Sequence, residues 1–369
     1  MINMKKILYV TTVSRTINAF LVPHIEMLIK EGHKVDCACS IDHELDEAIQ
    51  NKCENIYSLS FSRNPLDPNN LKSYKMLLEI QEKNNYDIVH VHTPIAALYG
   101  RLLKLKFPNI KTIYTVHGFH FHKGASKINW MLYYPIEKIM SMFTDVIITM
   151  NEEDYNRALT FNIDKVYKVN GVGLNLDSYK STEDDYIESR KELGLKEDDF
   201  VIGMIAEVNK NKNHKQIIDA IEHLNNRNIK LICAGEGVLL DSIRNEIKER
   251  NLQDNIKMLG FRTDVDKIIA ACDIGVLMSY REGLPRNIME LMASKKPVIG
   301  TNIRGIRDLI EDNKTGYLVE VGDYKSTANK IEKLYNNRNL LKELSKNCYR
   351  YIQKYDVNKV VEQLKEIYC

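Results

Sequence analysis

The sequence predicts an α/β protein built from two units, each with a parallel sheet covered by helices on both faces. Two stretches, residues 7–150 and 200–278, alternate short apolar runs with longer amphipathic segments. Such alternation is the pattern of consecutive strand–helix–strand units, which place parallel strands side by side. A length of 369 residues is sufficient for two domains of ordinary size.

The first stretch supplies the elements of the first unit. Strands are expected where apolar and β-branched residues cluster, at residues 7–13, 34–40, 87–92, 111–116 and 145–150. Amphipathic helices are expected at residues 18–31, closed by Gly32, and at residues 95–106.

The second stretch supplies the elements of the second unit. The expected strands are residues 200–205, 230–234, 256–259 and 274–278, and the expected helices are residues 214–226, 239–250 and 265–271. Asp264 immediately precedes the last of these helices, and its side chain is expected to cap the helix N-terminus.

The predicted division gives a first Rossmann-like domain over residues 1–172, a second over residues 173–345, and a C-terminal segment over residues 346–369. The pattern of Lys, Glu and Leu in residues 336–368 predicts a helix that crosses back onto the first domain. Open parallel sheets bind ligands outside the carboxyl ends of their strands. We therefore expect both of these edges to face a common cleft.

Composition and charge exclude several classes of protein. With 52 basic and 50 acidic residues, no bulk field attracts nucleic acid. Seven cysteines without a Cys-x-x-Cys pair argue against a disulfide framework and against a zinc site. The N-terminal apolar run is too short for a signal peptide, and no stretch approaches the roughly 18 apolar residues that span a bilayer. We therefore expect a cytoplasmic protein.

The most informative segment surrounds a Gly-Leu-Pro turn, with Glu282 before it and Glu290 in the helix that should follow. Pro285 suits the first helical position, where its missing N–H costs nothing. The backbone amides of Gly283 and Leu284 lie at that helix start, where unpaired N–H groups favour an anion. An anion beside two carboxylates fits a ligand that is part phosphate and part polyol, such as a nucleotide-sugar. Two glutamates near a helix start are also common on solvated faces.

Three histidines, His117, His120 and His122, follow the strand expected at residues 111–116. They could suggest a metal, but no second cluster has ligand spacing and nothing fixes a coordination number, so no metal site is predicted. His117 directly follows the strand, where an α/β sheet presents ligand-facing groups. A histidine at a strand end is also often a hydrogen-bonded core residue.

Two further patterns leave alternatives open. A Gly-x-Gly pair at residues 235–237 lacks the third glycine of the dinucleotide-binding motif, so no NAD cofactor is predicted. Basic residues beside apolar and aromatic ones, at residues 101–107 and 128–134, could rest on an anionic bilayer surface or form ordinary core with a solvated edge.

The string Glu-Gly-Leu-Pro-Arg-x-x-x-Glu from Glu282 to Glu290, with Leu-Met-Ala-Ser-x-x-Pro-Val-Ile after it, resembles the E-x7-E signature of retaining family-4 glycosyltransferases. The resemblance covers nearly the whole chain and is strongest over residues 200–320. It implies the GT-B fold, with two Rossmann-like domains facing a central cleft. The second domain would bind the nucleotide-sugar and the first the acceptor, as in bacterial capsule and exopolysaccharide biosynthesis.

The resemblance also implies roles for single residues. The catalytic residues would be His117 and Glu282: His117 would contact the donor sugar or help the attacking hydroxyl, and Glu282 would hydrogen-bond the sugar hydroxyls. Glu290 would hydrogen-bond the ribose hydroxyls. The amides of Gly283 and Leu284 would stabilise the charge that grows on the diphosphate leaving group.

One position departs from the family pattern. Lys212 fits the lysine that family members use to hold the donor diphosphate, but Glu207 stands where an arginine is expected. A carboxylate there repels phosphate unless it turns away or binds a hydroxyl or a cation. We hypothesise that Arg286 supplies the missing charge, because a guanidinium holds phosphate bidentately. Phe261 and Arg262 belong to a turn that lies near the nucleotide base in the family.

The predicted function is therefore a metal-independent, retaining glycosyltransferase of the hexosyltransferase type, without a cofactor. The expected partners are a nucleoside-diphosphate sugar, UDP-linked, and a lipid-linked or saccharide acceptor in surface polysaccharide assembly. Peripheral contact with the inner face of the membrane remains open. Two alternative functions also remain open: a sugar-nucleotide 2-epimerase of the same architecture, and a non-catalytic partner that binds nucleotide-sugars. Glu207 is the residue that favours the non-catalytic partner.

Overall fold

A computed structural model describes residues 4–180 and 182–368; residues 1–3, 181 and 369, and with them Cys369, lie outside it. The chain forms two compact units. The first unit runs to Gly173 and resumes at Val357, and the second unit is Leu174–Asp356. The return to the first unit thus comes later than the expected residue 346, because the helix before it packs in the second unit.

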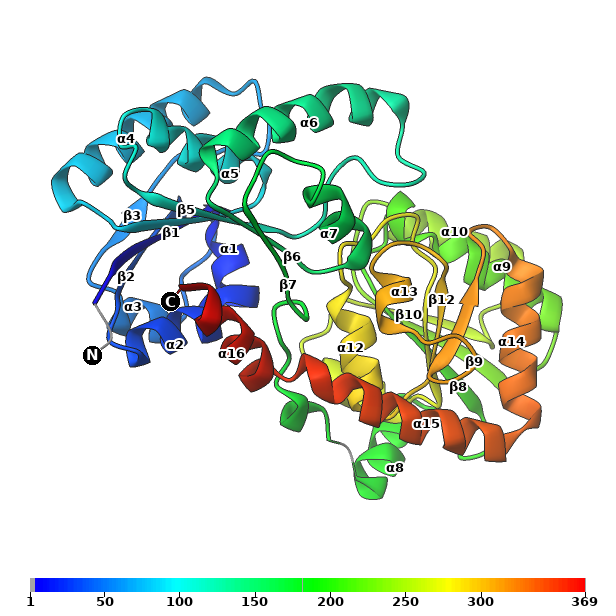
Figure 1. Ribbon diagram of the computed structural model, residues 1–369. Helices are drawn as coiled ribbons and strands as arrows, with labels where there is room; N and C mark the ends of the chain where they lie inside the picture. Colours follow the sequence, from blue (N-terminus) through cyan, green and yellow to red (C-terminus); the bar gives the residue numbers. More distant parts are fainter. Residues whose placement is uncertain (1–3, 181, 369) are drawn as a thin grey trace. The chain divides into compact units, whose positions relative to one another are not determined.

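In the described part of the chain, seven parallel strands form the sheet of the first unit, in the order β3-β2-β1-β4-β5-β6-β7 (Figure 1). The strands are β1 (Lys6–Val13), β2 (Lys34–Ser40), β3 (Ile56–Ser58), β4 (Ile88–His92), β5 (Lys111–Val116), β6 (Val146–Thr149) and β7 (Lys165–Lys168). The central strands β1, β4 and β5 are almost entirely buried, which is why they read as near-continuous apolar runs.

Helices cover this sheet on both faces. They are α1 (Ser14–Thr16), α2 (Val22–Lys30), α3 (Glu47–Lys52), α4 (Pro68–Asn84), α5 (Pro94–Leu102), α6 (Lys127–Met140), α7 (Glu152–Ala158) and α16 (Val357–Tyr368). Helices α4, α5 and α6 pack on one face, and α2, α3 and α16 on the other (Figure 1).

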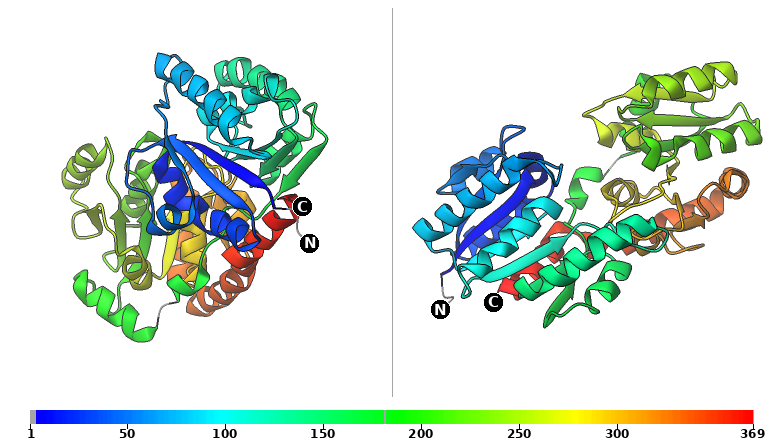
Figure 2. Two further views of the ribbon diagram at one scale, coloured as in Figure 1. Left: turned by 90° about the vertical axis from the view of Figure 1, so that its left-hand side faces the viewer. Right: turned by 90° about the horizontal axis from the view of Figure 1, so that it is seen from above.

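The C-terminal helix α16 crosses back onto the first unit, as predicted. It lies against α2 and is drawn in red in Figures 1 and 2. Its Tyr368 reaches the core, where the Tyr368 hydroxyl lies 2.5 Å from the Tyr9 hydroxyl of β1. The Lys365 ammonium also donates to Glu31 Oε1 at 2.8 Å. The apolar side chains of Val360, Leu364 and Ile367 are also buried, so α16 contributes to the core.

Two expectations for the first unit are corrected. The helix expected at residues 18–31 starts earlier and is not a regular α-helix throughout, because α1 and a π-helical turn at Ile17–Leu21 precede α2, which has Pro23 in its first turn. Helix α4 follows the Asp67 cap and was not predicted, because its sequence is polar on average and buries few apolar side chains.

Among the described residues, six parallel strands form the second sheet, in the order β10-β9-β8-β11-β12-β13. The strands are β8 (Phe200–Ile205), β9 (Ile229–Ala234), β10 (Ile256–Gly260), β11 (Ile274–Leu277), β12 (Val298–Thr301) and β13 (Gly316–Val319). Phe200 and Ile202 pack into one hydrophobic cluster and Val201 into another, so β8 is buried on both faces.

The helices of the second unit are α8 (Glu183–Glu192), α9 (His214–Leu224), α10 (Leu240–Glu249), α11 (Val265–Ala271), α12 (Arg286–Ala293), α13 (Ile306–Leu309), α14 (Tyr324–Asn336) and α15 (Arg338–Ile352). Helix α11 packs beside α8 over the smaller cluster, while α9, α12, α14 and α15 contribute to the larger one. In both units the parallel arrangement brings all carboxyl ends of the strands to one edge. No helix in residues 4–180 and 182–368 is both long and apolar enough to cross a bilayer.

Candidate functional site

A close ion pair joins two loops at the carboxyl edge of the second sheet. Lys212 lies in the loop after β8, and Glu282 lies in the loop after the neighbouring strand β11. The Lys212 ammonium donates to Glu282 Oε1 at 2.6 Å, and the two side chains are 20% and 12% exposed. The structure thus brings two of the sequence-predicted site residues into direct contact in the second unit.

Backbone contacts hold these two loops together. The amide of Lys212 donates to the Asn209 side chain at 3.1 Å. This hydrogen bond caps the single helical turn that contains Lys212. The amide of Tyr280 donates to the Asn211 carbonyl at 2.8 Å, and the Asn211 side chain donates to the Arg281 carbonyl at 2.9 Å. Lys212 and Glu282 therefore meet through a fixed backbone frame.

The second glutamate, Glu290, lies in α12 and accepts from two side chains. Arg286 Nε donates to Glu290 Oε1 at 3.0 Å, and the Tyr179 hydroxyl donates to the same oxygen at 2.8 Å. Burial, together with the Glu290 carboxylate, raises the pKa of Tyr179 to about 12. Helix α12 begins at Arg286 with Pro285 as its N-cap, so proline stands one position before the expected one.

The turn between the two glutamates is held from the side of β12. Arg304 is 4% exposed, and its Nε donates to the Glu282 carbonyl at 3.1 Å. Gly305 has a φ of +80°, and a Cβ built on it would lie 2.2 Å from the Gly283 carbonyl oxygen. Only glycine therefore allows this close approach to the half-buried backbone of Gly283 and Leu284.

Glu207 is exposed in the loop after β8. The neighbouring loop after β9 approaches it closely, since a Cβ on Gly235 would lie 2.0 Å from the Ala206 carbonyl oxygen. A Cβ on Gly237 would likewise lie 2.4 Å from the Val208 carbonyl oxygen. The Gly-x-Gly pair thus serves backbone packing beside Glu207.

The loop after β10 contains Phe261 and Arg262. Phe261 is 67% exposed, so its ring is available to a ligand. Arg262 Nε donates to Asp264 Oδ1 at 2.7 Å. Asp264 stands at the N-cap of α11 as expected, but the role predicted for its side chain is wrong, because the carboxylate binds Arg262 instead.

In the first unit, His117 directly follows β5, as predicted. Its Nε2 lies 3.2 Å from Nδ1 of His92, the last residue of β4. Burial lowers the pKa of His117 to about 4, so the imidazole is neutral at neutral pH. His120 stacks on Tyr133 with ring centroids 4.6 Å apart. Across residues 4–180 and 182–368, no group of three potential metal ligands occurs.

Sequence reasoning missed Tyr179, Arg304 and His92. Tyr179 is separated from Glu290 by 111 positions, and no pattern connects the two. Arg304 follows β12, and no local sequence pattern connects it with Glu282. The alternating His90 and His92 at the end of a buried strand were a usable signal, because buried polar residues require partners.

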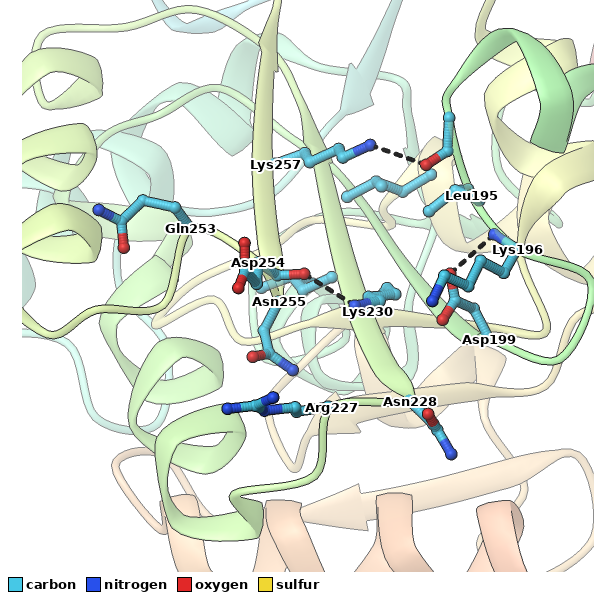
Figure 3. Close-up of a pocket in the computed structure, with 13 residues that line it drawn as sticks. Leu195, Lys196, Asp199, Arg227, Asn228, Lys230, Gln253, Asp254, Asn255 and Lys257 are labelled. Carbon is cyan, nitrogen blue, oxygen red and sulfur yellow. Dashed lines mark hydrogen bonds between the residues drawn. The ribbon is translucent and has the colours of Figure 1, made fainter.

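A groove of about 550 Å³ opens at the opposite edge of the second sheet (Figure 3). It lies where β8, β9 and β10 begin, and Figure 3 shows Lys230 and Lys257 beside it. The Lys230 ammonium donates to the Asp254 carbonyl at 2.8 Å, and that of Lys257 to the Leu193 carbonyl at 2.7 Å. Because ligands of parallel sheets bind at the carboxyl ends, this groove is separate from the candidate site.

Two family models match the chain. The model described as "Glycosyl transferases group 1" matches residues 185–351, which include the Lys212–Glu282 pair and Glu290. The model described as "Glycosyl transferase 4-like" matches residues 6–151, which include His92 and His117. The two matches fall on the second and first units respectively.

Similar proteins cover almost the full length. A relative from Bacillus subtilis (strain 168), "Putative glycosyltransferase EpsD", is 34% identical over 99% of this chain and 96% of its own length. A relative from Escherichia coli, "UDP-Gal:alpha-D-GlcNAc-diphosphoundecaprenol alpha-1,3-galactosyltransferase", is 25% identical over 93% of this chain and 90% of its own. The "Capsular polysaccharide biosynthesis glycosyltransferase CapM" of Staphylococcus aureus is 26% identical over 99% and 97%.

Solved structures share the fold. Anabaena Alr3699/HepE in complex with UDP and glucose superposes with a TM-score of 0.82 at 19% identity, over 99% of both chains. WaaG, described as a glycosyltransferase involved in lipopolysaccharide biosynthesis, gives a TM-score of 0.76 at 14% identity, over 98% of this chain and 99% of its own.

Proposed function

The chain belongs to the family-4 glycosyltransferases and has the GT-B fold, and on this premise we propose a retaining sugar transfer from a UDP-linked donor. The proposed acceptor is a lipid-linked or saccharide molecule of surface polysaccharide assembly. The observation that carries the proposal is the Lys212–Glu282 pair beside Glu290 at the carboxyl edge of the second sheet. The printed names of the Escherichia coli and Staphylococcus aureus relatives support this choice of donor and process.

Donor binding is proposed to separate Lys212 from Glu282, after which each residue contacts a different part of the donor. A diphosphate carries more negative charge than one carboxylate, so Lys212 turns toward it when the donor enters. The Glu282 carboxylate then accepts hydrogen bonds from hydroxyls of the donor sugar. After this exchange Lys212 is paired with the diphosphate and Glu282 is hydrogen-bonded by hydroxyls, so neither charged group of the partly buried site lacks a partner.

Glu290 is assigned to the ribose hydroxyls. A carboxylate offers about four lone-pair positions, so Glu290 can keep Tyr179 and Arg286 while it accepts from a ligand. Arg286, which contacts Glu290, is proposed to supply positive charge at the diphosphate. It would replace the arginine that the family has at the position of Glu207. The exposed ring of Phe261 and the neighbouring Arg262 are proposed to lie beside the nucleotide base.

Bond breaking is proposed to depend on hydrogen-bond donors of the chain rather than on a metal or cofactor. Lys212 and the amides of Gly283 and Leu284 oppose the charge that develops on the leaving diphosphate. His117, neutral at physiological pH, contacts the transferred sugar through one ring nitrogen. No covalent nucleophile is assigned, and transfer on one face of the sugar retains the anomeric configuration.

Peripheral contact with the membrane is proposed for α6. Its exposed apolar side chains recur at helical spacing and form one stripe: Ile128, Met131, Leu132, Ile136 and Ile139. Lys127 and Lys138 are exposed on the same helix. An apolar stripe with basic neighbours suits an anionic bilayer surface, where a lipid-linked acceptor would be held.

The proposed function is tested by supplying the purified chain with UDP-sugars and a polyprenyl-diphosphate-linked sugar. The expected result is an extended acceptor whose new bond has the anomeric configuration of the donor, read by NMR. A product of opposite configuration would exclude retention. A UDP-sugar epimerised without acceptor would instead support the epimerase, and an unconsumed donor would support a non-catalytic binding partner.

A further inference from the structure

Two histidines of the first unit meet at the ends of neighbouring strands. Strands β4 and β5 pair in parallel with His92 opposite Thr115, and His117 follows two residues later. His92 Nδ1 lies 3.2 Å from His117 Nε2, and the ring centroids are 5.4 Å apart. A hydrogen bond between two ring nitrogens requires one to carry the proton and the other to accept it.

His92 is the more firmly held of the two. It is 1% exposed, whereas His117 is partly exposed. The Tyr9 ring stacks on His92 at 5.4 Å with an interplanar angle of 22°, and the His90 ring lies 4.3 Å away. A buried ring fixed by such neighbours can impose its orientation on a more exposed partner.

Two proton arrangements fit this contact. Burial lowers the pKa of both histidines, so each ring carries one proton at neutral pH. In the first arrangement His92 Nδ1–H donates to His117 Nε2, which leaves the proton of His117 on its Nδ1. In the second, His117 Nε2–H donates to His92 Nδ1, which leaves the proton of His92 on its Nε2.

The surroundings of His92 distinguish these arrangements. Its Nε2 is buried and has no hydrogen-bond partner within residues 4–180 and 182–368. The second arrangement would place an N–H at this position, and buried N–H groups without a partner are rare in proteins, whereas the first arrangement leaves only a weakly accepting lone pair there. We propose that His92 is a positioning residue that donates to His117 and holds it with its proton on Nδ1.

The consequence concerns what His117 can do for a substrate. Its Nε2 lone pair is occupied by His92, so the nitrogen left for a ligand is a donor and not a base. His117 would therefore give a hydrogen bond to an oxygen of the transferred sugar, a role that rests on the proposed function. The tautomer itself does not depend on that function, because it follows from contacts within the first unit.

The direct test is ¹⁵N NMR of the full chain labelled at histidine, with His117→Asn used to assign the resonances. The expected spectrum shows His117 protonated at Nδ1 and bare at Nε2. A His117 that carries its proton on Nε2 in the wild-type protein would overturn the proposal. This readout needs no activity, so it separates failure of the tautomer from failure of the proposed function.

Two substitutions connect the tautomer to turnover. Asn places an amide N–H near the position of His92 Nδ1, whereas Leu places none there. His92→Leu should increase the Nε2-protonated fraction of His117 and lower kcat by about 10-fold with the donor KM nearly unchanged. His92→Asn should restore most of the tautomer and most of kcat. An unchanged His117 spectrum and kcat in folded His92→Leu would contradict the proposal.

Discussion

The Lys212 ammonium lies 2.6 Å from Oε1 of Glu282, and the two residues belong to loops that follow neighbouring strands of one sheet. The two charges of the pair neutralise each other, and backbone contacts between the loops hold them in place. A donor diphosphate must compete with Glu282 for Lys212. The first prediction therefore concerns the contribution of Lys212 to donor affinity.

Lys212→Ala should raise the dissociation constant of the UDP-sugar by about 10- to 150-fold. The reason is that a hydrogen bond to a charged group contributes about 1.5–3 kcal/mol, and 1.4 kcal/mol corresponds to a factor of ten. Isothermal titration calorimetry measures the constant. Lys210→Ala removes an exposed lysine of the same loop and should change it by less than about twofold. Equal affinities for Lys212→Ala and Lys210→Ala would remove Lys212 from the diphosphate site.

Arg286→Ala should also weaken donor binding, if this arginine compensates for Glu207. Glu207→Arg in the otherwise wild-type chain should then lower the dissociation constant of the donor by about 10-fold, because it places a guanidinium where the family has an arginine. The exposed position of Glu207 makes this substitution tolerable for folding. Glu207→Gln, which removes charge without adding any, is the matched control. An unchanged affinity for Arg286→Ala beside a large loss for Lys212→Ala would show that Arg286 does not serve the phosphates.

Glu290→Ala should lower kcat/KM by about 10- to 150-fold, since it removes charged hydrogen bonds to the ligand. Tyr179→Phe leaves the carboxylate in place and removes one donor to it. Its effect should be about 2- to 13-fold. Tyr351→Phe, which removes a hydroxyl bonded to the Asp308 carbonyl in the same unit, is the control and should leave kcat/KM unchanged. A Glu290→Ala enzyme within twofold of wild type would exclude this glutamate from the site.

Acid should destabilise both units. Burial lowers the pKa of His24 and of His214 from 6.5 to about 4, so each folded unit keeps a neutral histidine where the unfolded chain binds a proton. The free energy of unfolding therefore decreases as pH falls from about 6.5 to 4, by roughly 3 kcal/mol for each histidine, and this contribution is constant above pH 7.

Urea titrations at several pH values measure this dependence. His214→Gln should flatten it, and His43→Gln, an exposed histidine with 58% of its side chain accessible, should leave it as in the wild type. A pH dependence that is equally steep in both variants would show that His214 titrates normally in the folded protein.

Met131→Gln combined with Ile139→Gln should reduce binding to anionic vesicles. The two side chains are 78% and 55% exposed on the α6 stripe, and their polar replacements remove the apolar area that would enter the bilayer surface. Co-sedimentation with phosphatidylglycerol vesicles measures the bound fraction. Leu66→Gln alters a 90% exposed apolar residue away from α6 and should bind as the wild type does. Equal binding by all three proteins would contradict the assignment of α6.

Much of the fold was predictable because buried parallel strands carry a strong local signal. Strands β2, β5 and β8 have the predicted bounds, since their side chains are apolar almost throughout. Helices α4 and α6 were not predicted. Helix α4 is polar on average, and α6 presents apolar side chains on two sides, which obscures a single amphipathic period.

The candidate site was likewise predictable only in part. The motif around Glu282 and Glu290 specified by itself a helix start flanked by two carboxylates and, through its resemblance, the family of the chain. Only the tertiary structure decided that Lys212 pairs with Glu282, that Tyr179 supports Glu290, and that His92 contacts His117. These contacts join residues 70, 111 and 25 positions apart. The first and the third form because parallel strands bring their carboxyl ends to one edge of a sheet. The second forms because the turn at Leu176–Tyr179 packs against α12.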